Sequence, residues 1–325
     1  MNPAIDPPTV ADLTEDQLLA RIFPLLPAGA ATRLGPGDDA AVVAAPDGRV
    51  VVSTDVLVEG RHFRRDWSTG EDVGWRAAMQ NLADIAAMGA RPTSLVVTLV
   101  APADLPVDWV TGLATGLAAA CATCGVGVVG GDLSGGDAVV VSVTVLGDLD
   151  GRSPVLRSGA RVGDVVAHAG VRGWSAAGLA LLGAGCGEMA PALVRAYLRP
   201  DPPLEAGVAA SGAGATSMLD LSDGLLRDAG RLALASGVVL DLDLDAFAAD
   251  RRVLAAAAAA LGMRTEEWVL AGGEDHGLLA TFPPGTVLPE PFRAVGHVAA
   301  PGLTGPVLVD GQVPGISPGW DHFAR

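Results

Sequence analysis

Residues 108–132 read DWVTGLATGLAAACATCGVGVVGGD, and the fold can be predicted outward from this stretch. Its first part is rich in alanine, whereas the part after Gly125 is rich in valine and glycine. We interpret it as a helix over 108–124 and a strand over 126–129 that ends in Gly130-Gly131-Asp132. Glycine and threonine crowd the uncharged run, which favours this interpretation over a membrane span. A helix followed by a short apolar strand is the building unit of α/β proteins.

The same alternation of helices and strands extends in both directions along the chain. Asp47-Gly48 predicts a hairpin turn between strands at 40–45 and 50–53. The polar stretch 148–164 has no long periodic segment, so we place the boundary between domains 1–150 and 151–325 there. The pattern predicts an α/β or α+β protein of two domains. Further strands are expected over 95–100, 138–146, 165–169, 217–221 and 238–244, and helices over 14–24, 71–88, 175–182, 224–236 and 252–261.

Composition excludes several classes of function. The chain has 325 residues, 21 of them basic and 37 acidic, and a formal net charge of −16. Nucleic-acid binding is disfavoured, because affinity for phosphate comes from basic side chains. There is no lysine, which excludes lysine Schiff-base chemistry and the phosphate-loop lysine. The N-terminus does not resemble a signal peptide and three cysteines form no disulfide scaffold, so we expect a cytoplasmic protein without a membrane partner.

The residues most typical of a metal or catalytic site are acidic residues that lie next to glycine and beside apolar strands. We expect them in loops, at Asp38-Asp39, Asp55, Asp132, Asp220 with Asp223, and Glu274-Asp275. Aspartate and glycine are also the commonest turn residues, so each position alone has an ordinary turn as its alternative. Carboxylates at several strand ends can converge on one cleft, where hard oxygen ligands favour Mg²⁺ over zinc. Together these positions predict a magnesium site.

Two acidic positions have alternatives that residue patterns leave open. Asp84 lies among apolar residues inside the expected helix 71–88, where it either faces solvent or is paired or metal-bound. Asp220-Leu-Ser-Asp-Gly224 leads directly into another helix. Ser222 or Asp223 either caps that helix or, with the helix N-terminus, binds metal and phosphate.

Four tempting features are interpreted as structural. Cys121-x-x-Cys124 has no second cysteine pair, Asp241–Asp245 alternates as one solvated strand face, and Gly170–Ser175 is a glycine-rich turn. His62 and His168, each taken alone, are more typical of structural than of catalytic histidines.

Ten segments, taken in order, resemble the thiamine-monophosphate kinase family, in the superfamily of aminoimidazole ribonucleotide synthetase and selenophosphate synthetase. The reactive N-terminal cysteine or lysine of selenophosphate synthetase has no counterpart here. His276 replaces the tyrosine that relatives often carry, and we expect little consequence. The segments are GPGDDAAVV (35–43), STDVLVEGRHF (53–63), NLADIAAMGA (81–90), GGDLSGG (130–136), RSGARVGD (157–164), SAAGLALL (175–182), YLRPDPP (197–203), LDLSDGLLRD (219–228), GGEDHGL (272–278) and GWDHF (319–323).

The resemblance implies transfer of the γ-phosphoryl group of ATP to thiamine monophosphate, assisted by several Mg²⁺ ions. It implies an N-terminal domain that binds ATP and magnesium and dimerises through its sheet, and a C-terminal domain whose tail closes over the substrate. Matching positions imply catalytic roles for Asp132, Asp220 and Asp223. They imply magnesium ligands at Asp39, Ser53, Thr54, Asp55, Asp84, Asp132, Asp220 and Asp223, ATP contacts at Gly131, Asp132, Arg157 and Ser222, and substrate contacts at His62, Glu274 and Trp320.

The implied reaction suits these residue types. The acceptor is a phosphate oxygen that is already ionised at neutral pH, so direct in-line transfer needs neither a general base nor a phosphoenzyme. Magnesium held by carboxylates can align the two polyanions, and Arg157 can contact phosphate in a bidentate manner. Three alternatives remain: a metal-dependent phosphohydrolase, another ATP-dependent synthetase of the superfamily, and a nucleotide- or cation-binding regulatory module.

Overall fold

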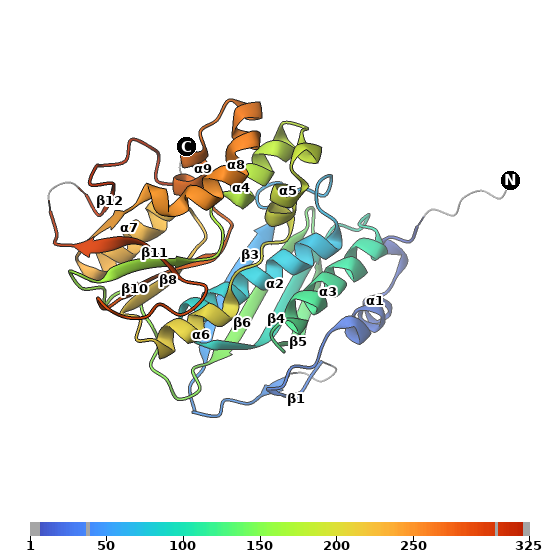
Figure 1. The fold of residues 1–325 in the computed structure, drawn as a ribbon. Coiled ribbons are helices and arrows are strands. Elements are labelled where there is room, and N and C mark those ends of the chain that lie inside the picture. The colour runs from blue at the N-terminus through green and yellow to red at the C-terminus, as the bar shows by residue number, and fades with distance from the viewer. Residues whose placement is uncertain (1–6, 37–39, 303–304, 321–325) are drawn as a thin grey trace. The chain divides into compact units, whose positions relative to one another are not determined.

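The computed structural model describes residues 7–36, 40–302 and 305–320, and Figure 1 shows its fold. The candidates Asp38 and Asp39 lie outside these residues. The chain divides into two compact units, the first made of 1–85 and 92–148 and the second of 86–91 and 149–325. No helix in the described segments is both long enough and apolar enough to cross a membrane.

The first unit is built on a four-stranded sheet. Its elements are η1 (Val10–Asp12), α1 (Glu15–Ile22), η2 (Phe23–Leu25), β1 (Thr32–Leu34), β2 (Val42–Val43), β3 (Val51–Val58), α2 (Gly70–Ala87), β4 (Arg91–Ala101), α3 (Val107–Ala122), β5 (Gly127–Gly135) and β6 (Val140–Asp148). The sheet order is β3-β6-β4-β5, with β3 and β6 antiparallel and β4 and β5 parallel. Helices α2 and α3 lie along one side of this sheet (Figure 1).

Side-chain alternation along the strands gives this sheet one buried and one open face. Leu57 of β3 and Val143 of β6 are almost completely buried. Val52 and Val56, which alternate with the inward residues of β3, are 63% and 44% exposed in the single chain. Antiparallel strands tolerate one solvated face, but that face is normally polar. The open face of the first unit therefore exposes apolar side chains beside the hydroxyls of Thr54 and Thr144.

The second unit has helices on both faces of a six-stranded sheet. Its elements are β7 (Val165–Ala169), α4 (Trp174–Gly183), η3 (Gly187–Met189), α5 (Pro191–Leu198), α6 (Leu204–Gly212), β8 (Ser217–Leu221), α7 (Leu225–Ser236), β9 (Val239–Leu242), η4 (Leu244–Phe247), α8 (Ala248–Leu261), α9 (Thr265–Ala271), β10 (Gly277–Phe282), β11 (Arg293–Ala299) and β12 (Val307–Val309). The sheet order is β12-β9-β11-β7-β10-β8. One core joins the sheet to α4, α7, α8 and α9, and a second joins it to α6.

The predicted mixed α/β class is confirmed, and most predicted elements are present. The run from 108 to 132 forms α3 and β5, as its change in composition indicates. The hairpin across Asp47-Gly48 is wrong, because β2 pairs with β1 while β3 pairs along its whole length with β6. Asp55 and Asp132 lie inside β3 and β5 rather than in loops, and Asp220 lies in β8, which has the range of the predicted strand 217–221. Backbone hydrogen bonds to a neighbouring strand extend each of these strands beyond its apolar residues, so the strand includes the acidic residue as well.

His168 of β7 is a completely buried histidine in the second unit. Its ring lies 5.8 Å from that of Phe247, and neither ring nitrogen has a hydrogen-bond partner among the described residues. Burial lowers the pKa of His168 well below its usual range, and the charges of Arg293 and Arg172 lower it further. The folded protein therefore holds this ring neutral.

Stability should fall as the pH falls through 6.5, where the unfolded chain begins to bind a proton that folded His168 rejects. Between pH 7.5 and 5.5 this group should lower the free energy of unfolding by about 1.4 kcal/mol. Urea unfolding of the wild type and of His168→Leu at both pH values measures the contribution, which the variant lacks. His297→Leu, at an exposed histidine of β11, is the matched control. Equal pH dependence in the wild type and His168→Leu would contradict the buried neutral ring.

Candidate functional site

Ser53, Asp55 and Asp84 are placed by β3 and α2 of the first unit. Ser53 and Asp55 alternate along β3 and so point to the same face. Ser53 Oγ donates a 2.7 Å hydrogen bond to Asp84 Oδ2, and the Asp55 amide donates a 3.0 Å bond to Asn81 Oδ1. Asn81 and Asp84 are three residues apart on α2 and share one helix face. Asp84 is therefore half-buried against the strand, with a polar partner.

Thr54, between Ser53 and Asp55, points to the opposite face of the sheet. Its hydroxyl donates to the carbonyl of Val143 at 2.9 Å and accepts a bond from the Thr144 hydroxyl at 3.3 Å. The sheet thus separates the Thr54 side chain from the acidic residues. Only its backbone carbonyl could contact a ligand shared with them.

Gly131 and Asp132 lie on the edge strand β5, opposite Val97 and Thr98 of β4. A Cβ atom at Gly131 would stand 2.0 Å from the carbonyl oxygen of Val97, so this close approach requires glycine. Asp132 is exposed. The strand therefore presents a carboxylate at the edge of the sheet.

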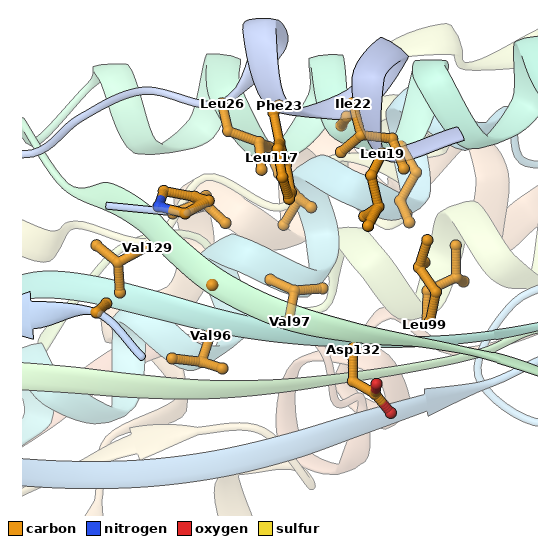
Figure 2. A pocket seen from close by; sticks show the side chains of 18 of the residues that line it. Leu19, Ile22, Phe23, Leu26, Val96, Val97, Leu99, Leu117, Val129 and Asp132 are labelled. Carbon is orange, nitrogen blue, oxygen red and sulfur yellow. The ribbon is translucent and has the colours of Figure 1, made fainter. Parts of the chain in front are cut away.

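An apolar pocket of about 650 Å³ lies beside Gly131 and Asp132, lined by α1, η2, α3, β4 and β5. Figure 2 shows Leu19 and Phe23 of the N-terminal segment and Leu117 of α3 facing the sheet across this pocket. Asp132 lies at its edge, with the carboxylate directed away from the apolar side chains (Figure 2). The sequence pattern does not reveal this pocket, because apolar residues that line a pocket and those that fill a core show the same periodicity.

His62 lies in a tight turn that follows β3. The Val58 amide donates a 3.0 Å hydrogen bond to His62 Nδ1. A neutral ring that accepts at Nδ1 carries its proton on Nε2. The backbone thus selects the tautomer in which Nε2 is the donor, which suits contact with an anionic group.

In the second unit, His276 bridges two candidate carboxylates. Its Nδ1 lies 3.3 Å from Asp220 Oδ2 and its Nε2 lies 3.6 Å from Glu274 Oε2. Burial lowers the pKa of His276, but the hydrogen bonds and charges of Asp220 and Glu274 outweigh it and raise the pKa to about 10. The ring is therefore a cation between two acids. We expected little consequence from the replacement of tyrosine by His276, but the structure shows His276 in contact with two candidate residues, Asp220 and Glu274.

Asp223 follows β8 and is paired with Arg231 of α7. One guanidinium nitrogen lies 2.7 Å from Asp223 Oδ2, and another lies 2.7 Å from Asp228 Oδ1. Asp228 is completely buried, and burial followed by the charge of Asp220 raises its pKa to about 6. Helix α7 begins without a side-chain cap, so the capping interpretation of Ser222 or Asp223 is wrong. The carboxylate of Asp223 is instead held by Arg231, and no pattern in the sequence indicates this pair.

The turn at Ser222-Asp223 holds two further candidate residues. The Glu274 amide donates to the Ser222 carbonyl at 2.8 Å, and the Trp320 amide donates to the Asp223 carbonyl at 2.9 Å. Gly319 has φ 131°, and a Cβ atom there would stand 2.2 Å from the Asp223 carbonyl oxygen. The tail is thus attached through its backbone, and the side chain of Trp320 is 56% exposed.

Arg157 lies in an exposed turn of the second unit. The Ser236 hydroxyl donates to the Arg157 carbonyl at 3.1 Å and accepts bonds from the amides of Gly159 and Ala160. The backbone of this turn is therefore anchored to the end of α7. Its arginine side chain reaches solvent.

The features interpreted as structural have identifiable places in the fold. Cys121 is buried in α3, and burial raises the pKa of its thiol, which makes it unreactive. Backbone amides of the Gly170–Ser175 turn bind the carboxylate of Asp275. Asp241 is in β9 but Asp243 lies beyond it, so the single solvated strand face predicted for 241–245 is wrong. Across the described residues, no three His, Cys, Asp or Glu side chains form a ready-made metal site.

Comparison with known proteins identifies relatives along nearly the whole chain. The model of the AIR synthase related protein N-terminal domain matches residues 37–149. Thiamine-monophosphate kinase of Mycobacterium tuberculosis is 50% identical over 99% of this chain and 95% of its own length. The enzyme of Corynebacterium glutamicum is 42% identical, covering 98% and 96%. A solved structure of AaThiL complexed with AMPPCP and TMP is 33% identical, covers 88% of this chain and 91% of its own, and has a TM-score of 0.76.

Gly319→Ala should detach the tail from the Ser222-Asp223 turn, because the added methyl group collides with the Asp223 carbonyl and disfavours φ 131°. Hydrogen–deuterium exchange of a peptide covering 316–320 should accelerate at least about tenfold. Gly315→Ala is the matched control, since among the described residues other than its chain neighbours no atom lies within 4 Å of its added methyl group. Unchanged exchange in Gly319→Ala would show that the tail is held by other contacts.

Proposed function

The chain belongs to the thiamine-monophosphate kinase family, and on this premise we propose how its residues divide the work of the reaction. The protein is an enzyme that phosphorylates thiamine monophosphate with ATP. One observation carries our assignment of residues: the backbone of the Ser222-Asp223 turn binds both Glu274 and Trp320. Candidate contacts for nucleotide, metal and acceptor are thereby attached to one turn.

Magnesium is assigned to oxygen ligands in each unit. In the first unit these are Ser53, the carbonyl of Thr54, Asp55, Asp84 and Asp132, together with Asp39; in the second they are Asp220 and Asp223. Carboxylate, hydroxyl and carbonyl oxygens are the donors that Mg²⁺ prefers. Ser53 holds Asp84 and Arg231 holds Asp223 in position, so both carboxylates are oriented before any ion arrives. Magnesium, when bound, supplies neutralisation of phosphate charge.

The chemistry demands little of the protein beyond charge and alignment. The acceptor oxygen of a phosphate monoester is ionised at neutral pH and needs no general base. We assign direct in-line transfer, with Asp132, Asp220 and Asp223 as the catalytic carboxylates. Arg157 is exposed and can bind a phosphate group in a bidentate manner, which suits a chain without lysine. Ser222 contributes a nucleotide contact from the turn.

The apolar pocket of the first unit is assigned to the base of ATP. It has the volume of a small-molecule site, and its walls are mainly apolar, with Glu15 and Asp132 as charged lining residues. Gly131 and Asp132, the residues implied to contact ATP, form part of its lining. A planar base can therefore be buried among leucine and valine side chains while its phosphates extend toward the carboxylate.

The acceptor, thiamine monophosphate, is assigned to His62, Glu274 and Trp320. His62 offers its Nε2 proton to a phosphate oxygen. Glu274 carries a negative charge that suits the cationic thiazolium ring, and the exposed face of Trp320 suits stacking on that ring.

The open sheet face around Val52 and Val56 exposes apolar side chains in the single chain. We assign this face to a second copy of the chain, as a homodimer interface.

Asp132→Asn and Asp223→Asn should each reduce thiamine diphosphate formation by at least about a hundredfold without unfolding the protein, because each removes a charge that binds magnesium. Asp137→Asn and Asp201→Asn, at exposed aspartates, are the controls for the two units. Chromatography with and without thiamine monophosphate follows product and ATP. Near-normal turnover in either variant would contradict its ligand role, and equal ATP consumption without acceptor would favour a phosphohydrolase.

Ala114→Trp should raise the KM for ATP at least about tenfold, because its indole fills the pocket that we assign to the base. Ala119→Trp, on the exposed face of the same helix α3, is the matched control and should leave that KM unchanged. The KM for thiamine monophosphate should stay within about threefold in both variants. An unchanged KM for ATP in folded Ala114→Trp would place the base elsewhere.

A further inference from the structure

The segment that carries Glu274 has an unusual backbone. Glu274 has φ 69° and His276 has φ 53°, a region that side-chain-bearing residues rarely occupy. Such conformations persist only where the surrounding structure holds them. On one side, the amides of Glu274 and His276 donate to the carbonyls of Ser222 and Leu221, at 2.8 and 3.2 Å. These two bonds attach the segment to the end of β8.

Asp275, between the two strained residues, holds the segment from the other side. Its side chain is completely buried. Oδ2 accepts a 2.6 Å hydrogen bond from the Gly173 amide, and Oδ1 accepts a 2.8 Å bond from the Ser175 amide. Both amides belong to the N-terminus of α4, where a carboxylate is stabilised by the helix dipole. The turn that resembles an anion-binding loop therefore binds a carboxylate of this same chain.

Arg172 completes the arrangement and is also completely buried. Its Nη1 lies 3.3 Å from Asp275 Oδ2. Its Nη2 donates to the carbonyl of Gly272, at the start of the segment, and to that of Val269 at 3.3 Å. One guanidinium thus binds both the main chain before Glu274 and the carboxylate after it.

Stability alone does not explain this buried ion pair. Apolar side chains of similar volume often replace such pairs without loss of stability, because the desolvation of two charges offsets their attraction. An apolar pair, however, could not orient two amides and two carbonyls. We propose that Arg172 and Asp275 are positioning residues that fix the Glu274 carboxylate for thiamine monophosphate. This proposal rests on the acceptor role assigned to Glu274 under Proposed function.

The test compares Asp275→Asn with Glu274→Gln and Asp164→Asn. Asp275→Asn keeps the side-chain shape but cannot accept from both amides of α4 and loses the ion pair. Asp164 is a buried aspartate of the same unit that accepts bonds from Arg161 and Thr216 and controls for general destabilisation. Asp275→Asn should raise the KM for thiamine monophosphate about tenfold while the KM for ATP changes less than about threefold. Asp164→Asn should lower the melting temperature without raising the KM for thiamine monophosphate more than the KM for ATP.

Arg172→Lys provides a second variant if Asp275→Asn does not fold. It keeps the positive charge but loses the planar guanidinium, whose separate nitrogens reach the two carbonyls and the carboxylate, so it should likewise raise the KM for thiamine monophosphate more than the KM for ATP. If Glu274→Gln raises the KM for thiamine monophosphate and the two positioning variants behave like Asp164→Asn, the positioning role is wrong. If Glu274→Gln has no effect, the acceptor role of Glu274 fails, and the positioning proposal fails with it.

Discussion

A carboxylate inside a folded protein must find a cation, a hydrogen-bond donor or a metal ion, because its charge is costly to bury. This constraint explains much of an enzyme with 37 acidic residues. Asp84 is bonded by Ser53, Asp220 by His276, and Asp275 by Arg172 and two helix amides. Arg231 serves Asp223 and Asp228 together. Several acids of the candidate site thus have a cation or a hydrogen-bond donor beside them.

These partners suggest how the binding residues stay ordered before substrate arrives. Arg231 is 39% exposed and has room to move away from Asp223, the proposed metal ligand, whereas Arg172 is completely buried and does not. The partly exposed Arg231–Asp223 pair suits an aspartate that exchanges its arginine for a metal ion, and the buried Arg172–Asp275 pair suits residues that must keep their place. The two arginines near the second unit's candidate residues thus differ in burial in the way that their proposed roles require.

Local patterns predicted helices and strands well, because hydrophobic periodicity and helix-ending glycines depend on residues only a few positions apart. Helix 71–88 and the helix and strand of 108–132 are examples. Pairing over long distances was not predictable: Asp47-Gly48 has the composition of a hairpin turn, yet β3 pairs with β6. The acidic candidates followed from their pattern beside glycine and apolar strands, and candidates such as His62, Arg157 and Trp320 followed from resemblance to a family, but neither source predicted the partners of these residues. Arg231 meets Asp223 only because α7 folds back beside β8. His276 meets Asp220 because His276 directly precedes β10, which pairs with β8.

The attachment of the C-terminal tail has a consequence for how this family can diversify. The bond to Asp223 uses the main-chain amide of residue 320, and the fit depends on Gly319 rather than on the indole. The bond itself places no requirement on the side chain at 320, since any residue other than proline supplies the same amide. A single codon change at this position would therefore replace the exposed aromatic surface of the tail and keep its main-chain bond to Asp223.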